Sequence, residues 1–479
     1  MPRTFALVAY DVWVKRFRYG RRSCIKAVKD ERRSNGRLEL PGRRICPVMV
    51  AALLVLGIVL GFQGLQLMCA ITHDPDYEDF CYQRLNDPYP FFARLREQDP
   101  VHWCEPMHMW LVTRYDDVRA ALRDKEKRLS TSRRPMYTDP LLPENRARAA
   151  PMIDHICRWL LNVDPPDHTR MRRLVSLVFT PRMLQDLTPR IEAIVEGLLD
   201  DICAADEADL IHSFSLPLPA AVICEMLGVP DDRRELYCEC VKGMLPFSSG
   251  GGPAINDHID EAQTCLDRLI TLFDEIIAER RTNPQADLIT AMTEAEADGD
   301  RLSREELFAL CVFIFTAGHE TTSSLLASGM LAFLQNPEQF EKFKTDPDGL
   351  VDSAVEEFLR YDPPVTRGAR VALQDFELRG KQIREGQTIT HLIGAANRDP
   401  EVFDNPDKVD ITRQPNNHVG FGFGMHFCLG AHLARIEGSV AFRAVARRLP
   451  NLLLADNDLL FKRALGLRSL EKLHVHVNA

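Results

Sequence analysis

Cys428 follows a run of alternating glycines and precedes a helical pattern. The stretch GFGFGMHFCLGAHLAR, from Gly420 to Arg435, has glycines where the backbone can turn tightly or approach a flat group closely. A helix that begins near Gly430 would direct free amide groups toward the sulfur and favour its thiolate form. Because a thiolate binds metals, the stretch predicts a metal site with one protein sulfur ligand.

Other interpretations of this stretch are a phosphate-binding loop, a plain turn or a small buried cysteine. No Lys-Ser or Lys-Thr pair follows the glycines, and no GxGxxG motif is complete. A phosphate-binding loop is therefore disfavoured.

A second group of reactive side chains lies within the longest predicted helix. Ser303 and Glu306 form a capping box, and an apolar pattern then continues to about Gln335 on nearly all sides. We therefore expect a buried helix. Its middle, from Ala317 to Thr322, nevertheless holds residues that are poor for helix stability, including an acid that is costly to bury unpaired. These residues either serve packing, with the threonine hydroxyls donating to carbonyls one turn earlier in the helix, or they form a functional site.

Two pairs of charged residues are spaced so that each shares one helix face. His168 and Arg172 lie four apart in DPPDHTRMRR, and Glu357 and Arg360 lie three apart in VDSAVEEFLRY. By themselves they indicate a solvated basic turn and a surface ion pair, and surface pairs contribute little stability.

Three motifs together resemble the cytochrome P450 family. The string F-G-x-G-x-H-x-C-x-G at residues 421–430 resembles its haem-binding loop, A-G-x-E-T at 317–321 its oxygen-activating stretch, and E-x-x-R at 357–360 its second fixed motif. The resemblance covers about residues 80–479. It implies a mainly α fold with a small β region, in which haem lies between the long helix and the cysteine loop of a single large domain.

The resemblance also implies a role for each motif residue. Cys428 would be the thiolate ligand of haem b (iron protoporphyrin IX), a ligand type that favours O–O cleavage. Glu320 would help deliver protons, Thr321 would hydrogen-bond the oxygen molecule, and Gly318 would let haem and oxygen approach the helix. Glu357 and Arg360 would form a buried pair that holds the haem-side core. The remaining cofactor-binding residues, including partners of the haem propionates, would be His168, Arg172, Ala317, Arg370, Phe421, Gly422, His426 and Gly430.

The function implied is an NAD(P)H-driven monooxygenase of secondary metabolism that hydroxylates or epoxidises an apolar small molecule with O2. As in the soluble bacterial class, electrons would come from a ferredoxin and an NAD(P)H-ferredoxin reductase, because no flavin domain follows the haem part. Arginines of the last long helix, at 435, 443, 447 and 448, would offer an acidic partner a positive landing area. The alternatives are a peroxide-using haem-thiolate enzyme, which the Glu320–Thr321 pair disfavours, and a membrane-anchored haem sensor or binding protein.

The composition fits a globular protein whose partners do not include nucleic acid. The 479 residues are 45% hydrophobic and 27% charged, and the net charge is −10, the wrong sign for binding a polyanion. Thirteen cysteines without a CxxC pair indicate reduced thiols. We therefore predict a cytoplasmic location.

The first 75 residues differ from residues 76–479, which we assign to the haem-thiolate domain. Residues 1–45 hold 13 basic and 4 acidic residues, and an apolar segment within 46–71 is long enough for a membrane span or a signal-sequence core. The flanking charges would place the catalytic part outside the cytoplasm, in conflict with cytosolic electron donors. The explanations left open are an anchor of unusual orientation, a peripheral basic segment, and an assigned start upstream of a true start at Met68.

The rest of the chain carries weaker structural signals. Hairpins are predicted around Glu105 and Pro106, at the turns Gly380 and Gly386, and at the chain end, where we read no metal site at His474 and His476. Residues 130–163 carry prolines and charge without clean periodicity, which predicts a long mobile connection. The run from Ser248 to Pro253 should separate two helices.

Overall fold

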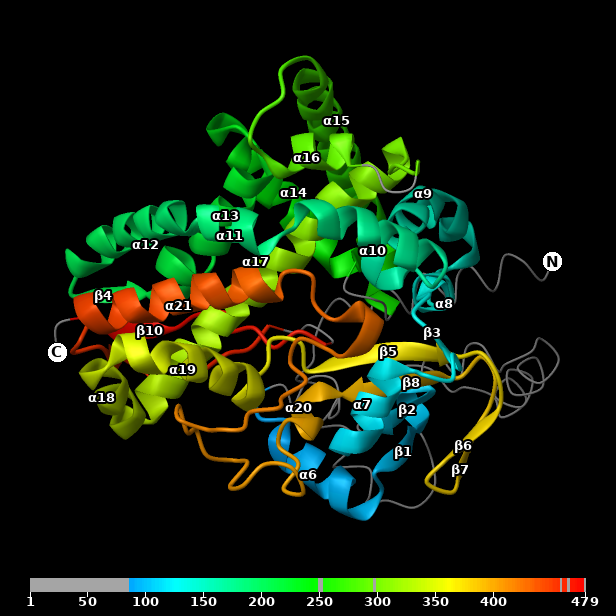
Figure 1. Ribbon diagram of the computed structural model, residues 1–479. Coiled ribbons are helices and arrows are strands. Elements are labelled where there is room, and N and C mark those ends of the chain that lie inside the picture. The colour runs from blue at the N-terminus through cyan, green and yellow to red at the C-terminus, as the bar shows by residue number, and fades with distance from the viewer. Residues whose placement is uncertain (1–85, 249–252, 296–298, 457–458, 463–465, 478–479) are drawn as a thin grey trace, which may run out of the picture. The chain divides into compact units, whose positions relative to one another are not determined.

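The long predicted helix is present and lies at the centre of the contacts between helices (Figure 1). The computed structural model describes residues 86–248, 253–295, 299–456, 459–462 and 466–477, within one compact unit that spans residues 68–479. Helix α17 (Arg304–Gln335) begins at the predicted capping box, with Ser303 as N-cap and Glu306 at N3. It ends before Pro337, the first residue of α18, and 32 residues give it a length of about 48 Å.

Helices α13 (Pro217–Leu227), α19 (Pro347–Tyr361) and α21 (Ala431–Arg448) pack against α17. Each presents an apolar face to the core, and α17 itself is buried on nearly all sides, as its sequence predicted. Helix α14 (Arg234–Ser248) lies against α15 (Ile259–Thr282), and the break between them falls where the Ser/Gly run predicted one.

The small β region is a five-stranded sheet in the order β1-β2-β8-β5-β3. Strands β1 (Val101–Cys104) and β2 (Met109–Val112) form the predicted hairpin, while β5 (Arg367–Ala372) pairs with β8 (Thr388–Leu392). Strands β6 (Phe376–Leu378) and β7 (Lys381–Ile383) form a second hairpin, in which Arg379 and Gly380 both have positive φ, as in a type I′ turn. Figure 1 shows the five-stranded sheet apart from helices α12 to α16.

The prediction for the chain end was partly wrong. Strand β10 (His474–His476) pairs with β9 (Leu453–Leu454), which precedes it closely in the sequence, and also with β4 (Glu207–Asp209), which is distant in sequence. The pairing of β9 with β10 continues toward the turn, where Phe461 lies opposite Leu470, so the hairpin starts earlier than predicted. No cluster of three or more metal-ligating side chains occurs in the described ranges.

The prediction of a long mobile connection over residues 130–163 was also wrong. This segment contains helices α8 (Arg134–Thr138) and α9 (Arg146–Cys157), the second with Pro151 inside it. Met152, Ile153 and Ile156 of α9 are almost fully buried in the main core. Tertiary packing therefore stabilises a helix that the local pattern did not reveal.

The calls on residues 1–75 lie outside the described residues. Among the helices that are described, none combines the length and apolar character needed to cross a bilayer. The remaining helices and strand are α6 (Tyr89–Gln98), α7 (Tyr115–Arg123), β3 (Leu129–Ser130), α10 (Asp167–Val178), α11 (Pro181–Asp186), α12 (Thr188–Cys203), α16 (Leu288–Glu294), α18 (Pro337–Thr345) and α20 (Ile393–Ala396).

Candidate active site

Cys428 ends a glycine-rich loop immediately before α21. Gly422 and Gly424 have φ of 74° and 79°, a region that favours glycine, and the Cys428 N–H donates to the Phe421 carbonyl at 2.9 Å. A Cβ on Gly430, the N-cap of α21, would meet no atom within 4 Å beyond its chain neighbours and its own helix backbone. The Cys428 side chain is solvent accessible, as a ligand to an incoming group must be.

The protonation of Cys428 differs from the prediction. Burial raises the pKa of the thiol, because protein atoms surround it on most sides. The backbone N–H of Gly430 and the charges of Arg172 and Arg435 act in the opposite, predicted direction but are outweighed. A metal ion at the sulfur would therefore have to contribute to its deprotonation.

Four predicted propionate partners come together near this loop. The rings of His168 and His426 lie 4.1 Å apart between centroids, and each has a buried Nε2 without a hydrogen-bond partner in the part of the chain described. Burial lowers the pKa of His426 to about 3 and also lowers the pKa values of His168 and Arg172. Burial and nearby Arg133 lower the pKa of Arg370 to about 10.

Unpaired donors beside mutually repelling cations are unfavourable unless an anionic ligand binds among them. Haem supplies two carboxylates, so this cluster and the accessible Cys428 sulfur fit that cofactor. Arg133 and His391 belong to the same cluster. Arg133 lowers the pKa of Arg370, and Arg370 in turn lowers the pKa of His391. Neither residue could have been identified from its spacing in the sequence.

Helix α17 has one accessible face in its otherwise buried middle. Phe313, Ala317 and Thr321 are only partly buried and lie four residues apart, so they share that face. The Thr321 hydroxyl donates to the Ala317 carbonyl at 2.6 Å, the back-bonded geometry that we considered as the packing alternative. Glu320 is buried and paired with Lys462, whose Nζ lies 2.6 Å from its Oε1.

Gly318 lies at a close contact between two helices. A Cβ at this position would lie 2.5 Å from Cδ1 of Ile223, which belongs to α13. The glycine therefore permits close packing between α13 and α17.

Glu357 and Arg360 are both fully buried, so they are not a surface pair. Two hydrogen bonds of 2.8 Å join them, and Arg360 also donates to the carbonyls of Asn397, Pro406 and Lys408. Arg413 donates to the same carboxylate at 3.1 Å. This third member was missed because it lies in an irregular segment more than fifty residues away along the chain.

The landing area predicted on α21 is not an unpaired positive surface. Its arginines all lie in ion pairs with acids of other helices: Arg435 with Glu356, Arg443 and Arg447 with Asp348, and Arg448 with Glu196 and Asp200.

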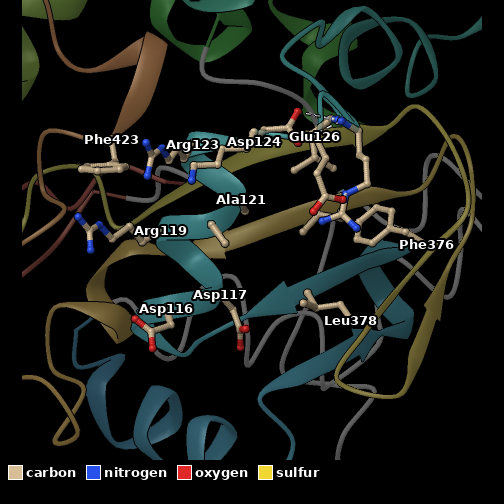
Figure 2. A pocket seen from close by; sticks show the side chains of 15 residues that line it. Asp116, Asp117, Arg119, Ala121, Arg123, Asp124, Glu126, Phe376, Leu378 and Phe423 are labelled. Atoms are coloured by element: carbon tan, nitrogen blue, oxygen red, sulfur yellow. Dashed lines mark hydrogen bonds and ion pairs between the residues drawn. The ribbon is translucent and has the colours of Figure 1, made fainter.

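A surface pocket of about 360 Å³ lies beside α7 and includes Phe423 of the cysteine loop (Figure 2). Arg119 stacks 4.4 Å from the centroid of the Phe423 ring, and Asp117 and Arg123 lie on the same helix. None of the predicted catalytic residues lines this pocket, so it is not a substrate chamber.

Comparisons with known proteins agree with this geometry. The family model described as cytochrome P450 matches residues 243–450. The polyketide biosynthesis cytochrome P450 PksS of Bacillus subtilis is 38% identical over 402 residues, covering 82% of this chain and 96% of the relative. The vitamin D(3) 25-hydroxylase of Pseudonocardia autotrophica is 37% identical over 396 residues, covering 81% and 93%.

Solved structures give the same result. The crystal structure of P450BioI in complex with hexadec-9Z-enoic acid ligated acyl carrier protein has a TM-score of 0.75 at 34% identity. The alignment covers 83% of this chain and 99% of P450BioI. With relatives of this similarity along most of its length, the chain belongs to the cytochrome P450 family, the haem-thiolate monooxygenases.

Proposed function

We propose that Cys428 would supply the thiolate that binds haem iron in this monooxygenase and that His168, Arg172, Arg370 and His426 would hold the haem propionates. Once bound, the haem supplies oxygen activation with electrons delivered from outside. The observation that carries the proposal is the accessible Cys428 sulfur next to a cluster in which the Nε2 atoms of His168 and His426 have no hydrogen-bond partner among the described residues. The substrate would be oxygenated beside the accessible face of α17.

The ligand assignment is tested by replacing Cys428 with alanine. The thiolate-specific absorption band of the reduced carbon monoxide complex should disappear, because the iron would lose its thiolate ligand. Cys203→Ser is the matched control, since that cysteine is also partly exposed and lies on α12. A thiolate spectrum that survives in Cys428→Ala would refute the assignment.

We assign proton handling to Glu320 and Thr321. Oxygen insertion consumes protons as well as electrons, and one oxygen atom leaves as water. The Thr321 hydroxyl lies on the accessible face of α17 and can exchange its bond to Ala317 for one to a reacting group. In Thr321→Ala the product formed per NAD(P)H should fall and hydrogen peroxide should rise, whereas Thr321→Ser should keep most of the coupling. Unchanged coupling in Thr321→Ala would contradict this role.

The substrate is proposed to be an apolar small molecule. Phe313 on the accessible face of α17 packs against Trp159, with ring centroids 5.7 Å apart, so aromatic surface borders this side of the helix. The names of the relatives point the same way, to polyketides, vitamin D3 and a fatty acid on a carrier protein. A spectral screen that follows displacement of water from the haem iron would identify ligands. Strictly peroxide-dependent turnover of such a ligand would favour the peroxide-using alternative.

A ferredoxin, reduced by an NAD(P)H-ferredoxin reductase, is the proposed electron donor. Its docking site is proposed to lie on α7 instead of α21, because Arg119 and Arg123 of α7 are exposed and make no ion pair within the described ranges. Met425 and Phe427 of the cysteine loop are also exposed, at 41% and 40%. The loop touches α7, because a Cβ on Gly424 would lie 3.0 Å from the Cα of Arg123. Cations beside apolar side chains fit an acidic protein that must approach the haem.

Charge reversal separates the two docking surfaces. Arg119→Glu with Arg123→Glu should raise the ferredoxin concentration needed for half-maximal turnover and weaken its salt dependence. Arg443→Glu with Arg447→Glu, on α21, is the matched comparison. The α7 assignment fails if only the α21 pair has an effect.

A further inference from the structure

A hairpin near the end of the chain holds the buried acid in the middle of α17. Lys462 Nζ lies 2.6 Å from Glu320 Oε1, and the Ser469 hydroxyl donates to the same oxygen at 3.3 Å. Lys462 and Ser469 face each other across the hairpin, because the Lys462 N–H donates to the Ser469 carbonyl at 2.8 Å. Two side chains from one short element therefore converge on one carboxylate oxygen.

The hairpin is itself held in place on two sides. Leu467 pairs with Val365 in an antiparallel bridge, and Arg468 Nε donates to Asp362 Oδ1 at 2.6 Å. Further along, the Leu473 carbonyl accepts from the N–H of Leu210. These contacts anchor the segment that carries Lys462 and Ser469 to the rest of the fold, so the two side chains can hold Glu320 in a fixed position.

The two oxygens of Glu320 are thus in different situations. Oε1 has both partners from the hairpin, whereas Oε2 makes no hydrogen bond to any described residue. Lys462 is 31% exposed and Glu320 10% exposed at the side chain, so the ion pair reaches from the surface into the core. Because the interior screens charge poorly, a partner at this distance strongly orients the carboxylate.

We propose that Lys462 and Ser469 are positioning residues that fix Oε1 of Glu320 and so leave Oε2 to exchange protons beside Thr321. The inference rests on the proposed role of Glu320. In the balanced reaction the substrate gains one oxygen atom, the other leaves as water, and the electrons come from NAD(P)H through the ferredoxin. Glu320 only passes protons, and each one it gives up is replaced from solvent.

The expected consequence is a loss of coupling rather than of oxygen consumption. A carboxylate that can turn away delivers protons less dependably, so more of the consumed oxygen leaves as hydrogen peroxide. In Lys462→Met, product per NAD(P)H should fall by about threefold or more. Lys462→Arg retains the positive charge and should restore a large part of the coupling. Ser469→Ala removes one hydroxyl and should have a smaller effect in the same direction.

Lys472→Met is the matched control. Lys472 lies next to the same hairpin, its side chain is 34% exposed, and it forms an ion pair with Asp456 at 3.8 Å. Its replacement removes the same charge with a similar surface change and should leave coupling at the level of the unaltered protein.

A second readout does not depend on turnover. Urea unfolding of the haem-loaded protein is compared for Lys462→Met, Glu320→Gln and the double variant. If the two side chains act as a pair, the midpoint shift of the double variant should be clearly smaller than the sum of the single shifts. Additive shifts would overturn the proposed pairing, and this result is informative even if Lys462→Met loses some haem.

Glu320→Gln separates failure of this inference from failure of the proposed function. If Glu320→Gln leaves coupling unchanged, the proton role of Glu320 is wrong. If it lowers coupling but Lys462→Met and Ser469→Ala do not, the positioning role is wrong while the proposed function stands. If Lys462→Met and Lys462→Arg lose coupling and stability equally, the lysine is merely structural and the inference is overturned.

Discussion

Glu437 is a buried carboxyl that should make this protein less stable as the pH rises. It lies on α21 with 1% of its surface exposed, and its Oε2 has no hydrogen-bond partner among the residues described. Burial raises the pKa of Glu437 to about 8, because a charged carboxylate is costly to bury. The folded protein therefore retains this proton at neutral pH.

The size of the effect follows from proton linkage. The unfolded chain releases the same proton at an ordinary glutamate pKa of about 4.3. Between that pH and the folded-state pKa of about 8, the folded state binds more protons than the unfolded state. The free energy of unfolding should therefore fall by up to about 1.4 kcal/mol per pH unit. At neutral pH the accumulated loss is about 3 to 4 kcal/mol, and it is absent below the unfolded-state pKa.

Glu437→Gln isolates this contribution, since glutamine has the shape of the protonated side chain and does not titrate. Urea unfolding of the haem-loaded protein, followed by tryptophan fluorescence from about pH 5 to about pH 8, gives the stability difference between variant and parent. The difference should grow in favour of the variant as the pH rises. Glu192→Gln, at an exposed position on α12, is the control. A difference that is constant, or that grows toward acid pH, would refute the reasoning.

Three further predictions concern the packing around the site. Arg360→Lys keeps the charge but loses the planar guanidinium group that donates to Glu357 and to three carbonyls. It should therefore destabilise the protein by about 3 kcal/mol or more and weaken haem retention. An unchanged denaturation midpoint would contradict this. Gly318→Ala should cost about 1 to 3 kcal/mol through its clash with Ile223, and adding Ile223→Val, which removes the clashing Cδ1, should recover much of that loss. Gly197→Ala, where a Cβ meets nothing within 4 Å, should be neutral or stabilising in the same assay. Gly424→Ala should loosen the cysteine loop, because φ is +79° and a Cβ would lie 3.0 Å from the Leu122 carbonyl and the Cα of Arg123; haem binding as tight as in the parent would argue otherwise.

Features that depend on short stretches of chain could be predicted from the sequence. The capping box at Ser303 and Glu306 starts α17 because its contacts span only three residues. The glycines before Cys428 shape its loop through their own φ values, and the helix after Gly430 begins where the pattern changes. Glu357 and Arg360 share a helix face by spacing alone. The family resemblance then assigned these local features to one haem site.

What each of these groups does electrostatically was decided only by the tertiary structure. The spacing of Glu357 and Arg360 is the same for a surface pair and a buried one, and only the fold buries them and adds Arg413. Lys462 pairs with Glu320, which is 142 positions away in the sequence. Arg133 lies close enough to Arg370 to lower its pKa, although the two are far apart in the sequence. From the sequence, the arginines of α21 had no visible acidic partners, whereas in the structure they form ion pairs with acids of α12 and α19. Ion pairing and desolvation depend on neighbours in space, and local sequence patterns do not contain that information.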